Sequence, residues 1–177
     1  MPKYKNTPDR KISHFGFSTN PQYEGKKLIT TFYNEGKIIF DGYDILSRGD
    51  TIYCKKEGTI HLGYHVHLSQ NVFLECEKEI NIGSRSIIGF DTLIMDSDNH
   101  RLFDEESPNR IINLPSSVNI GEHCWVGCRC TILKGAHIFS NNVIAGGAII
   151  TSGSNESSYV VLGSNSKILK SHIIWNV

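Results

Sequence analysis

The residues best suited to chemistry lie in one short run of the chain, Asp96-Ser-Asp-Asn-His100. A histidine with a side-chain pKa of about 6.5 is largely neutral near pH 7, so His100 can accept a proton as a general base. Asp96 or Asp98 can hold the imidazole in the required tautomer, accept a hydrogen bond from a substrate, or only shape a turn. For His100 the alternative is a surface histidine without a chemical role.

Cysteines and histidines raise the question of a metal site. Cys124, Cys128 and Cys130 lie close together, but their spacing differs from that of paired-cysteine zinc motifs. We expect Cys124 and Cys130 to point inward as small packing residues of a reducing compartment. His61 and His67 are six residues apart, which predicts one shared face, yet the sequence offers no clear third ligand. We therefore expect no metal.

A six-residue repeat must position these side chains. In the second half of the chain large aliphatic residues stand six apart, a period that belongs neither to a helix nor to a single strand. The residues two positions earlier are nearly all small, and glycines recur near the expected turns. The large residues are Ile120, Val126, Ile132, Ile138, Ile144 and Ile150, and the small positions are Val118, Cys124, Cys130, Ala136, Asn142 and Ala148.

The same period occurs earlier, with one slip of two residues, at Leu62, Leu68, Leu74, Ile82, Ile88 and Ile94. Such repetition predicts an all-β solenoid in which each coil buries its apolar face against the next coil. We predict a single domain with the solenoid at residues 37–152, a protruding loop at residues 96–117 and a C-terminal segment at residues 153–177. Residues 1–36 are aromatic enough to cap the open end of the solenoid.

Composition and charge narrow the range of functions that the chain can have. Eighteen basic and eighteen acidic side chains balance, so the net charge advertises no nucleic-acid partner. The chain shows no run of apolar residues long enough to span a membrane and no secretory leader. We expect a cytoplasmic protein without a membrane span.

Three stretches resemble one family: Asp96–His100, Cys124-Trp-Val-Gly127 with Ile132-Leu-Lys-Gly135, and the segment from Val143 to Thr151. From Gly36 onward the chain is similar to the hexapeptide-repeat acyltransferases, and most similar to sugar O-acetyltransferases of polysaccharide gene clusters and to maltose and galactoside acetyltransferases. The resemblance implies a left-handed parallel β-helix, acetyl-coenzyme A as the acyl donor, and a homotrimer with active sites between subunits.

The resemblance also assigns site residues. It implies that His100 is the general base and that Trp125 lines the pocket near both acceptor and donor. Of the roles open to the two aspartates, we assign the support of His100 to Asp98 and contact with the sugar to Asp96. A tryptophan that only packs between subunits is the alternative for Trp125. The implied donor-binding positions are Cys128, Gly146, Thr151, Lys167 and Lys170, with a main-chain N–H near Cys128 as oxyanion donor.

The resulting hypothesis is an acetyl-coenzyme A-dependent sugar O-acetyltransferase. A nucleotide-sugar N-acetyltransferase is the second hypothesis, because the same fold can acetylate an amine. A catalytically silent β-helix used as a scaffold is the third, and His100 and Trp125 argue against it. The sequence does not name the acceptor sugar.

Overall fold

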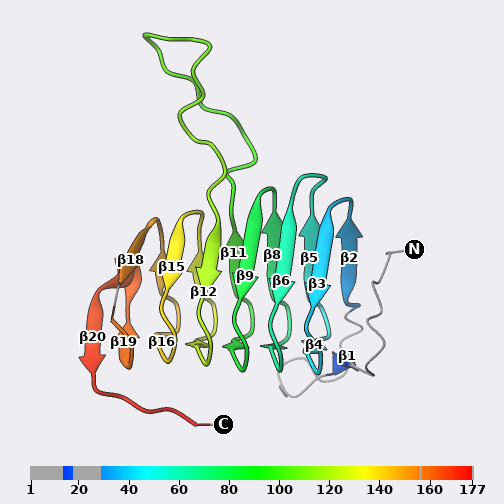
Figure 1. The fold of residues 1–177 in the computed structure, drawn as a ribbon, viewed down its shortest axis with the longest axis vertical. Coiled ribbons are helices and arrows are strands. Elements are labelled where there is room, and N and C mark those ends of the chain that lie inside the picture. The colour runs from blue at the N-terminus through cyan, green and yellow to red at the C-terminus, as the bar shows by residue number, and fades with distance from the viewer. Residues whose placement is uncertain (1–13, 18–28, 156, 177) are drawn as a thin grey trace.

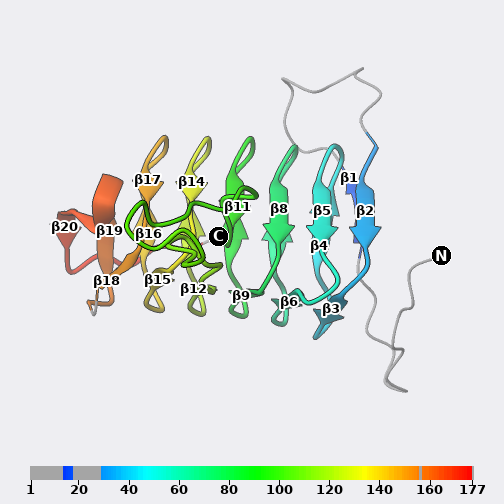
Figure 2. The ribbon, with the colours of Figure 1, turned by 90° about the horizontal axis from the view of Figure 1, so that it is seen from above.

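The structure is a computed structural model that describes residues 14–17, 29–155 and 157–176. Its strands form three sheets, parallel except for the last strand of one of them, that wrap into a left-handed parallel β-helix, as predicted (Figure 1). Each coil contributes one short strand to each sheet, and successive coils follow one another along the axis (Figure 2). Most of the predicted cap, residues 1–36, lies outside the described residues.

The three sheets have the following strands in chain order. Sheet A contains β1 (His14–Phe17), β4 (Ile45–Ser47), β7 (His67–Leu68), β10 (Ile87–Ile88), β13 (Trp125–Val126), β16 (Val143–Ile144), β19 (Val160–Leu162) and β20 (Ile168–Ser171). Sheet B contains β2 (Thr31–Asn34), β5 (Thr51–Cys54), β8 (Phe73–Cys76), β11 (Leu93–Met95), β14 (Thr131–Ile132) and β17 (Ile149–Ile150). Sheet C contains β3 (Lys37–Phe40), β6 (Thr59–Leu62), β9 (Glu79–Ile82), β12 (Val118–Ile120), β15 (Ala136–Ile138) and β18 (Gly153–Asn155). The 3-10 helix η2 (Ser164–Ser166) separates β19 from β20.

Parallel pairing extends beyond residues 37–152 at both ends. Strand β2 pairs in parallel with β5, and β16 pairs in parallel with β19. The regular coils therefore span more of the chain than the hexads alone predict, because strands without a clean six-residue pattern can still extend an existing parallel ladder.

The repeated aliphatic residues form the core. Ile88, Val126 and Ile144 follow one another in register on sheet A, and each is fully buried. The small positions are buried as well, among them Cys124 and Cys130. Each hexad thus turns a large and a small side chain inward, which fills the narrow interior of the coil.

The six-residue period places consecutive hexads on different faces. His61 lies on β6 of sheet C and pairs with Asp41 at 3.0 Å, whereas His67 lies on β7 of sheet A. The prediction that these two histidines share one face is therefore wrong. Residues stack only after a full coil, as His67 does on Ile45 and Ile87.

One corner of the β-helix is replaced by a long excursion. Residues 96–117, here called the long loop, leave β11 of sheet B and return to β12 of sheet C (Figure 1). The loop stands away from the body on the edge between these sheets, and sheet A lies on the other side of the body (Figure 1). An isolated bridge between Phe103 and Ile111 holds its two arms together.

Candidate active site

Asp96 begins the long loop and is fully buried. Its carboxylate accepts hydrogen bonds from the backbone N–H groups of Glu77, Lys78 and Glu79 at 2.6–2.7 Å. These donors belong to the turn between β8 and β9, which would otherwise leave them unpaired. The structure therefore gives Asp96 the turn-shaping role that was the alternative to sugar binding, since no carboxylate oxygen is left facing solvent.

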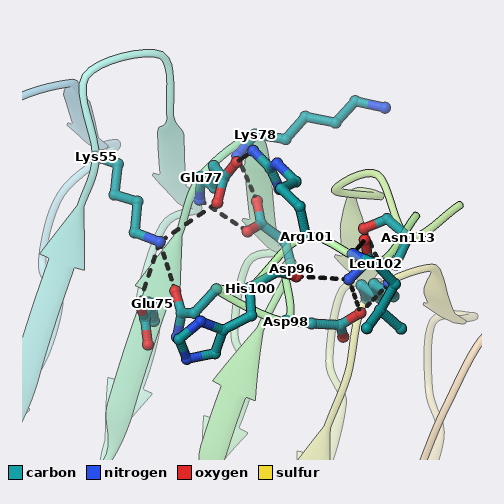
Figure 3. Close-up of polar contacts among 12 residues, drawn as sticks. Lys55, Glu75, Glu77, Lys78, Asp96, Asp98, His100, Arg101, Leu102 and Asn113 are labelled. Atoms are coloured by element: carbon teal, nitrogen blue, oxygen red, sulfur yellow. Dashed lines mark hydrogen bonds and ion pairs between the residues drawn. The ribbon is translucent and has the colours of Figure 1, made fainter. Parts of the chain in front are cut away.

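Asp98 lies at the neck of the long loop. Its carboxylate accepts a hydrogen bond from the side-chain amide of Asn113 at 2.9 Å and contacts the ammonium of Lys134. The hydrogen bonds from Lys134 and then from Asn113 hold the pKa of Asp98 below its usual range. Figure 3 shows Asp98 turned toward Asn113 and away from the ring of His100. Asp98 thus fixes the loop neck and does not orient the imidazole through a direct contact.

Asn113 joins the two arms of the loop. Its side chain is buried, donates to the carbonyl oxygen of His100 at 2.7 Å, and accepts from the N–H of Leu102 at 2.7 Å. The N–H of His100 donates to the carbonyl oxygen of Asp98 at 2.7 Å. The backbone around His100 is therefore clamped on both sides.

The imidazole of His100 is exposed, and in the described part of the chain it makes no hydrogen bond. Figure 3 shows its ring on the side of Glu75 and Lys55. A fixed backbone with an exposed imidazole suits a general base, because the ring nitrogens remain accessible to a substrate.

A charged network surrounds this position. Lys55 pairs with Glu75 at 3.4 Å and with Glu77 at 3.3 Å, and its ammonium also donates to the side chain of Asn99. Arg101 contacts the other oxygen of Glu77. Burial opposes the charge on Glu77, but the hydrogen bonds from Arg101 and Lys55 outweigh it and lower the pKa of this carboxyl group. These contacts tie the loop to the two preceding coils.

Trp125 lies on the outer face of sheet A, where it is 44% exposed. The following Gly127 is required by packing, because a Cβ there would lie 2.6 Å from the backbone nitrogen of Gly146. The Trp-Val-Gly motif therefore combines an outward aromatic ring, an inward valine and a close approach to the next coil.

Cys128 and Gly146 lie next to each other on the corner between sheets A and B. The N–H of Gly147 donates to the carbonyl oxygen of Cys128 at 2.8 Å, and Gly146 is exposed. Within the described residues neither Cys128 nor Gly146 donates its own N–H to another group. Two free amides in neighbouring coils can bind an extended polar ligand.

The remaining predicted donor residues lie in three places. Lys167 is exposed at the end of the same corner, directly after η2, whose Ser164 hydroxyl accepts the N–H of Ile149. Lys170 is exposed on β20, where it pairs with Val161 at the edge of sheet A. Thr151 follows β17 at the other edge of sheet B and does not join Cys128 and Gly146. The structure therefore places Cys128, Gly146 and Lys167 along one corner, with Lys170 on the adjoining edge of sheet A and Thr151 apart.

Cys124 and Cys130 serve packing. Burial raises the pKa of the Cys124 thiol to about 11 and also raises that of Cys130. No group of three or more metal-ligating side chains is found in the part of the chain that the structure describes. Among the same residues no helix has the length and apolar character needed to cross a bilayer.

Comparisons with known proteins identify two relatives in sequence. Over 147 residues the chain is 27% identical to the putative lipopolysaccharide biosynthesis O-acetyl transferase WbbJ of Escherichia coli K12, covering 78% of this chain and 74% of WbbJ. Over 131 residues it is 31% identical to a polysialic acid O-acetyltransferase of Escherichia coli O1:K1, covering 74% of this chain but 40% of that protein. No family model matches the chain. Both relatives are named as O-acetyltransferases, and the chain is similar to them over about three quarters of its length.

Solved structures agree on the fold. The polysialic acid O-acetyltransferase OatWY aligns with a TM-score of 0.55 at 19% identity, covering 93% of this chain and 90% of OatWY. A point mutant of AntD, an N-acyltransferase from Bacillus cereus in complex with dTDP and coenzyme A, aligns with a TM-score of 0.66 at 14% identity, covering 92% of this chain and 84% of AntD. At identities this low, the structural alignments show a shared fold and nothing about function.

Sequence reasoning missed three residues of this acyltransferase. Lys134 stands inside a recognised motif, but its pairing with Asp98 depends on the loop lying beside β14. Asn113 and Trp175, whose ring lies 6.1 Å from that of Trp125, have partners 11 to 15 and 52 residues away, so neighbouring residues do not reveal their contacts. A polar residue at the returning end of a loop that begins with Asp-Ser-Asp-Asn-His is the one hint that the sequence offered for Asn113.

Proposed function

We propose that this acyltransferase moves an acetyl group from acetyl-coenzyme A to a hydroxyl group of a sugar during synthesis of a surface polysaccharide, such as capsule, O-antigen or exopolysaccharide. Two relatives named as O-acetyltransferases support the reaction class. The observation that carries the proposal is His100, whose backbone is clamped by Asp98 and Asn113 while its imidazole is exposed. The predicted cytoplasmic location is part of the same proposal.

In the proposed reaction His100 removes the proton of the sugar hydroxyl while the oxygen attacks the thioester carbonyl carbon. The negative charge that forms on the carbonyl oxygen is stabilised by the free N–H of Cys128. The C–S bond then breaks, and His100 returns the proton to the sulfur so that coenzyme A leaves as the thiol. Asp98 acts as a positioning residue through the loop neck, and no covalent enzyme intermediate forms.

The acyl donor fits the corner that carries Cys128 and Gly146. Their free N–H groups suit the amide oxygens of the pantetheine arm, and Lys167 at the end of the corner and Lys170 on the adjoining edge of sheet A suit the phosphates. Contacts to backbone amides do not depend on side-chain identity. Thr151 remains a proposed donor contact only if it is reached from a neighbouring coil or subunit.

We also propose a homotrimer with each active site between two subunits. The long loop, which carries His100, leaves the edge between sheets B and C, whereas sheet A, which carries Trp125, lies on the other side of the body (Figure 1). One chain therefore does not bring both residues to one substrate. The loop also exposes Leu102, Phe103 and Leu114 by more than half of their surface, which suits contact with a second copy.

Thiol release from acetyl-coenzyme A, measured with a panel of sugars, oligosaccharides and nucleotide-linked amino sugars, tests this function. We expect wild type to acetylate a hydroxyl acceptor and His100→Ala to lose roughly 10²- to 10⁴-fold in kcat. His137→Ala, which removes an exposed histidine on sheet C, is the matched control and should retain full activity. Full activity of His100→Ala on such an acceptor would falsify the assignment of the base.

The same panel of acceptors distinguishes an N-acetyltransferase from an O-acetyltransferase. An amine acceptor must lose a proton before it attacks, so its rate shows an additional ionisation in the pH profile. Transfer only to amino sugars would replace the O-acetyltransferase proposal. Failure to bind acetyl-coenzyme A in calorimetry would favour the scaffold hypothesis.

A further inference from the structure

The C-terminus reverses direction after the last coil. Strand β20 pairs antiparallel with β19, whereas the other strand pairings among the described residues are parallel. Residues 172–176, here called the C-terminal tail, then run back beneath sheet A (Figure 1). The tail is held by the N–H of Ile173, which donates to the carbonyl oxygen of Tyr159 at 2.9 Å.

The tail carries Trp175 to the coil that contains Trp125. The indole of Trp175 stacks on the imidazole of His123, with ring centroids 4.4 Å apart and planes only 9° apart. Its ring N–H donates to the carbonyl oxygen of His123 at 3.1 Å. Stacking and a directional hydrogen bond together fix both the position and the orientation of the indole.

Two indoles therefore lie side by side on the outer face of sheet A. The ring centroids of Trp125 and Trp175 are 6.1 Å apart, and their planes are inclined by 44°. Trp125 is 44% exposed, and Trp175 is half-buried. The neighbouring Ile174, by contrast, is 88% exposed, so the tail turns its aromatic residue, and not its aliphatic one, toward the site.

We propose that Trp175 is a specificity-determining residue that joins Trp125 in binding a pyranose ring of the acceptor. This inference rests on the proposed function, because Trp125 is the predicted residue of the acetyl-transfer site. The apolar C–H face of a pyranose packs on an aromatic plane, and two planes of different inclination select the orientation of the ring. His123 supports Trp175 from its other face and sets its position.

Steady-state kinetics of Trp175→Ala with the acceptor found in the panel tests the proposal. We expect the KM of the acceptor to rise about 2- to 10-fold, the range expected for loss of one aromatic stacking contact, with the KM of acetyl-coenzyme A unchanged. Trp175→Phe keeps an aromatic face and should recover part of the loss. Ile174→Ala is the matched control in the same tail and should match wild type. An unchanged acceptor KM in Trp175→Ala would overturn the inference and leave the proposed function intact.

A second measurement does not need turnover. The sequence contains two tryptophans, so exciton coupling between Trp125 and Trp175 is visible in circular dichroism as a couplet that both Trp125→Phe and Trp175→Phe abolish. Titration with maltose and with oligosialic acid should change tryptophan fluorescence in wild type and less in Trp175→Ala. If no sugar is acetylated, the proposed function fails, whereas absence of the couplet, or a couplet without any response to either sugar, overturns the role of Trp175.

Discussion

The edge between sheets B and C and the outer face of sheet A differ in chemistry. The edge carries ion pairs and a carboxylate-amide-lysine cluster that hold the long loop and His100. The face carries aromatic rings, among them Trp125 and the stacked Trp175. The charged edge suits proton transfer, the aromatic face suits binding of a sugar ring, and the two meet only if a second copy of the chain brings its loop to the face.

Both regions depend on a break in the repeat. The long loop replaces a corner of a few residues, and the C-terminal tail follows the antiparallel strand β20. The regular coils bury their hexads and leave little else to vary. A solenoid of this kind therefore supplies a rigid body, and its interruptions supply the chemistry.

The sharpest test of the comparison is complementation between the two regions. His100→Ala and Trp125→Ala should each lose most activity alone, since each removes one half of every site. Mixed after unfolding and reassembly, they should regain a fraction of wild-type turnover, because some interfaces combine an intact loop with an intact face. Mixing that restores nothing, with both variants assembled, would place the site within one subunit.

Asp96 and Asp98 provide a matched pair at the edge. Asp96→Ala leaves three part-buried backbone N–H groups without their acceptor, and a fully buried unpaired donor costs about 1–3 kcal/mol. Because water reaches part of this turn, we expect the free energy of unfolding in urea to fall by about 2–3 kcal/mol in total. Asp98→Ala, at an exposed site, should change it by at most about 1 kcal/mol while lowering kcat. Equal destabilisation by the two variants would contradict the division of roles.

Asn113→Ala should lower activity with a smaller effect on stability. The change removes the hydrogen bonds to Leu102, to Asp98 and to the carbonyl of His100, so the loop neck loosens. Misplacement of a catalytic group by about 1 Å can cost about 10²-fold, and we expect a loss in kcat of up to that size. Asn109→Ala, at an exposed position of the same loop, is the control. A wild-type kcat for Asn113→Ala would show that the hydrogen bonds of Asn113 at the loop neck do not contribute to catalysis.

The last prediction concerns two buried carboxyl groups far from the loop. Burial raises the pKa of Asp50 to about 8 and that of Asp44 to about 7, from 3.8. The folded state then binds more protons than the unfolded state between these values, so this part of the unfolding free energy is present near pH 4 and is lost as pH rises to about 8. Urea unfolding of Asp50→Asn should show a weaker decline over that window. An unaltered pH dependence would assign the decline to other groups.

The sequence predicted the solenoid well because core packing repeats locally. The pattern of each hexad predicts its own inward residues, such as Cys124 and Val126, and both are buried in the structure. The sequence also located the long loop, since the repeat stops after Ile94 and resumes at Val118. The function of individual loop residues was harder to predict, as Asp96 shows, because identical carboxylates differ only in which donors surround them.

The amino-acid sequence by itself determined the β-helix, its core and the position of His100 in the long loop. Only the tertiary structure decided which residues meet across coils: Asp96 with the turn before β9, Asp98 with Lys134, and Trp175 with His123. The physical reason is that hexads fix which way a side chain points, whereas its neighbour in the next coil depends on the lengths of every corner between them. The path of the long loop and the reversal of the C-terminal tail cannot be read from a six-residue period.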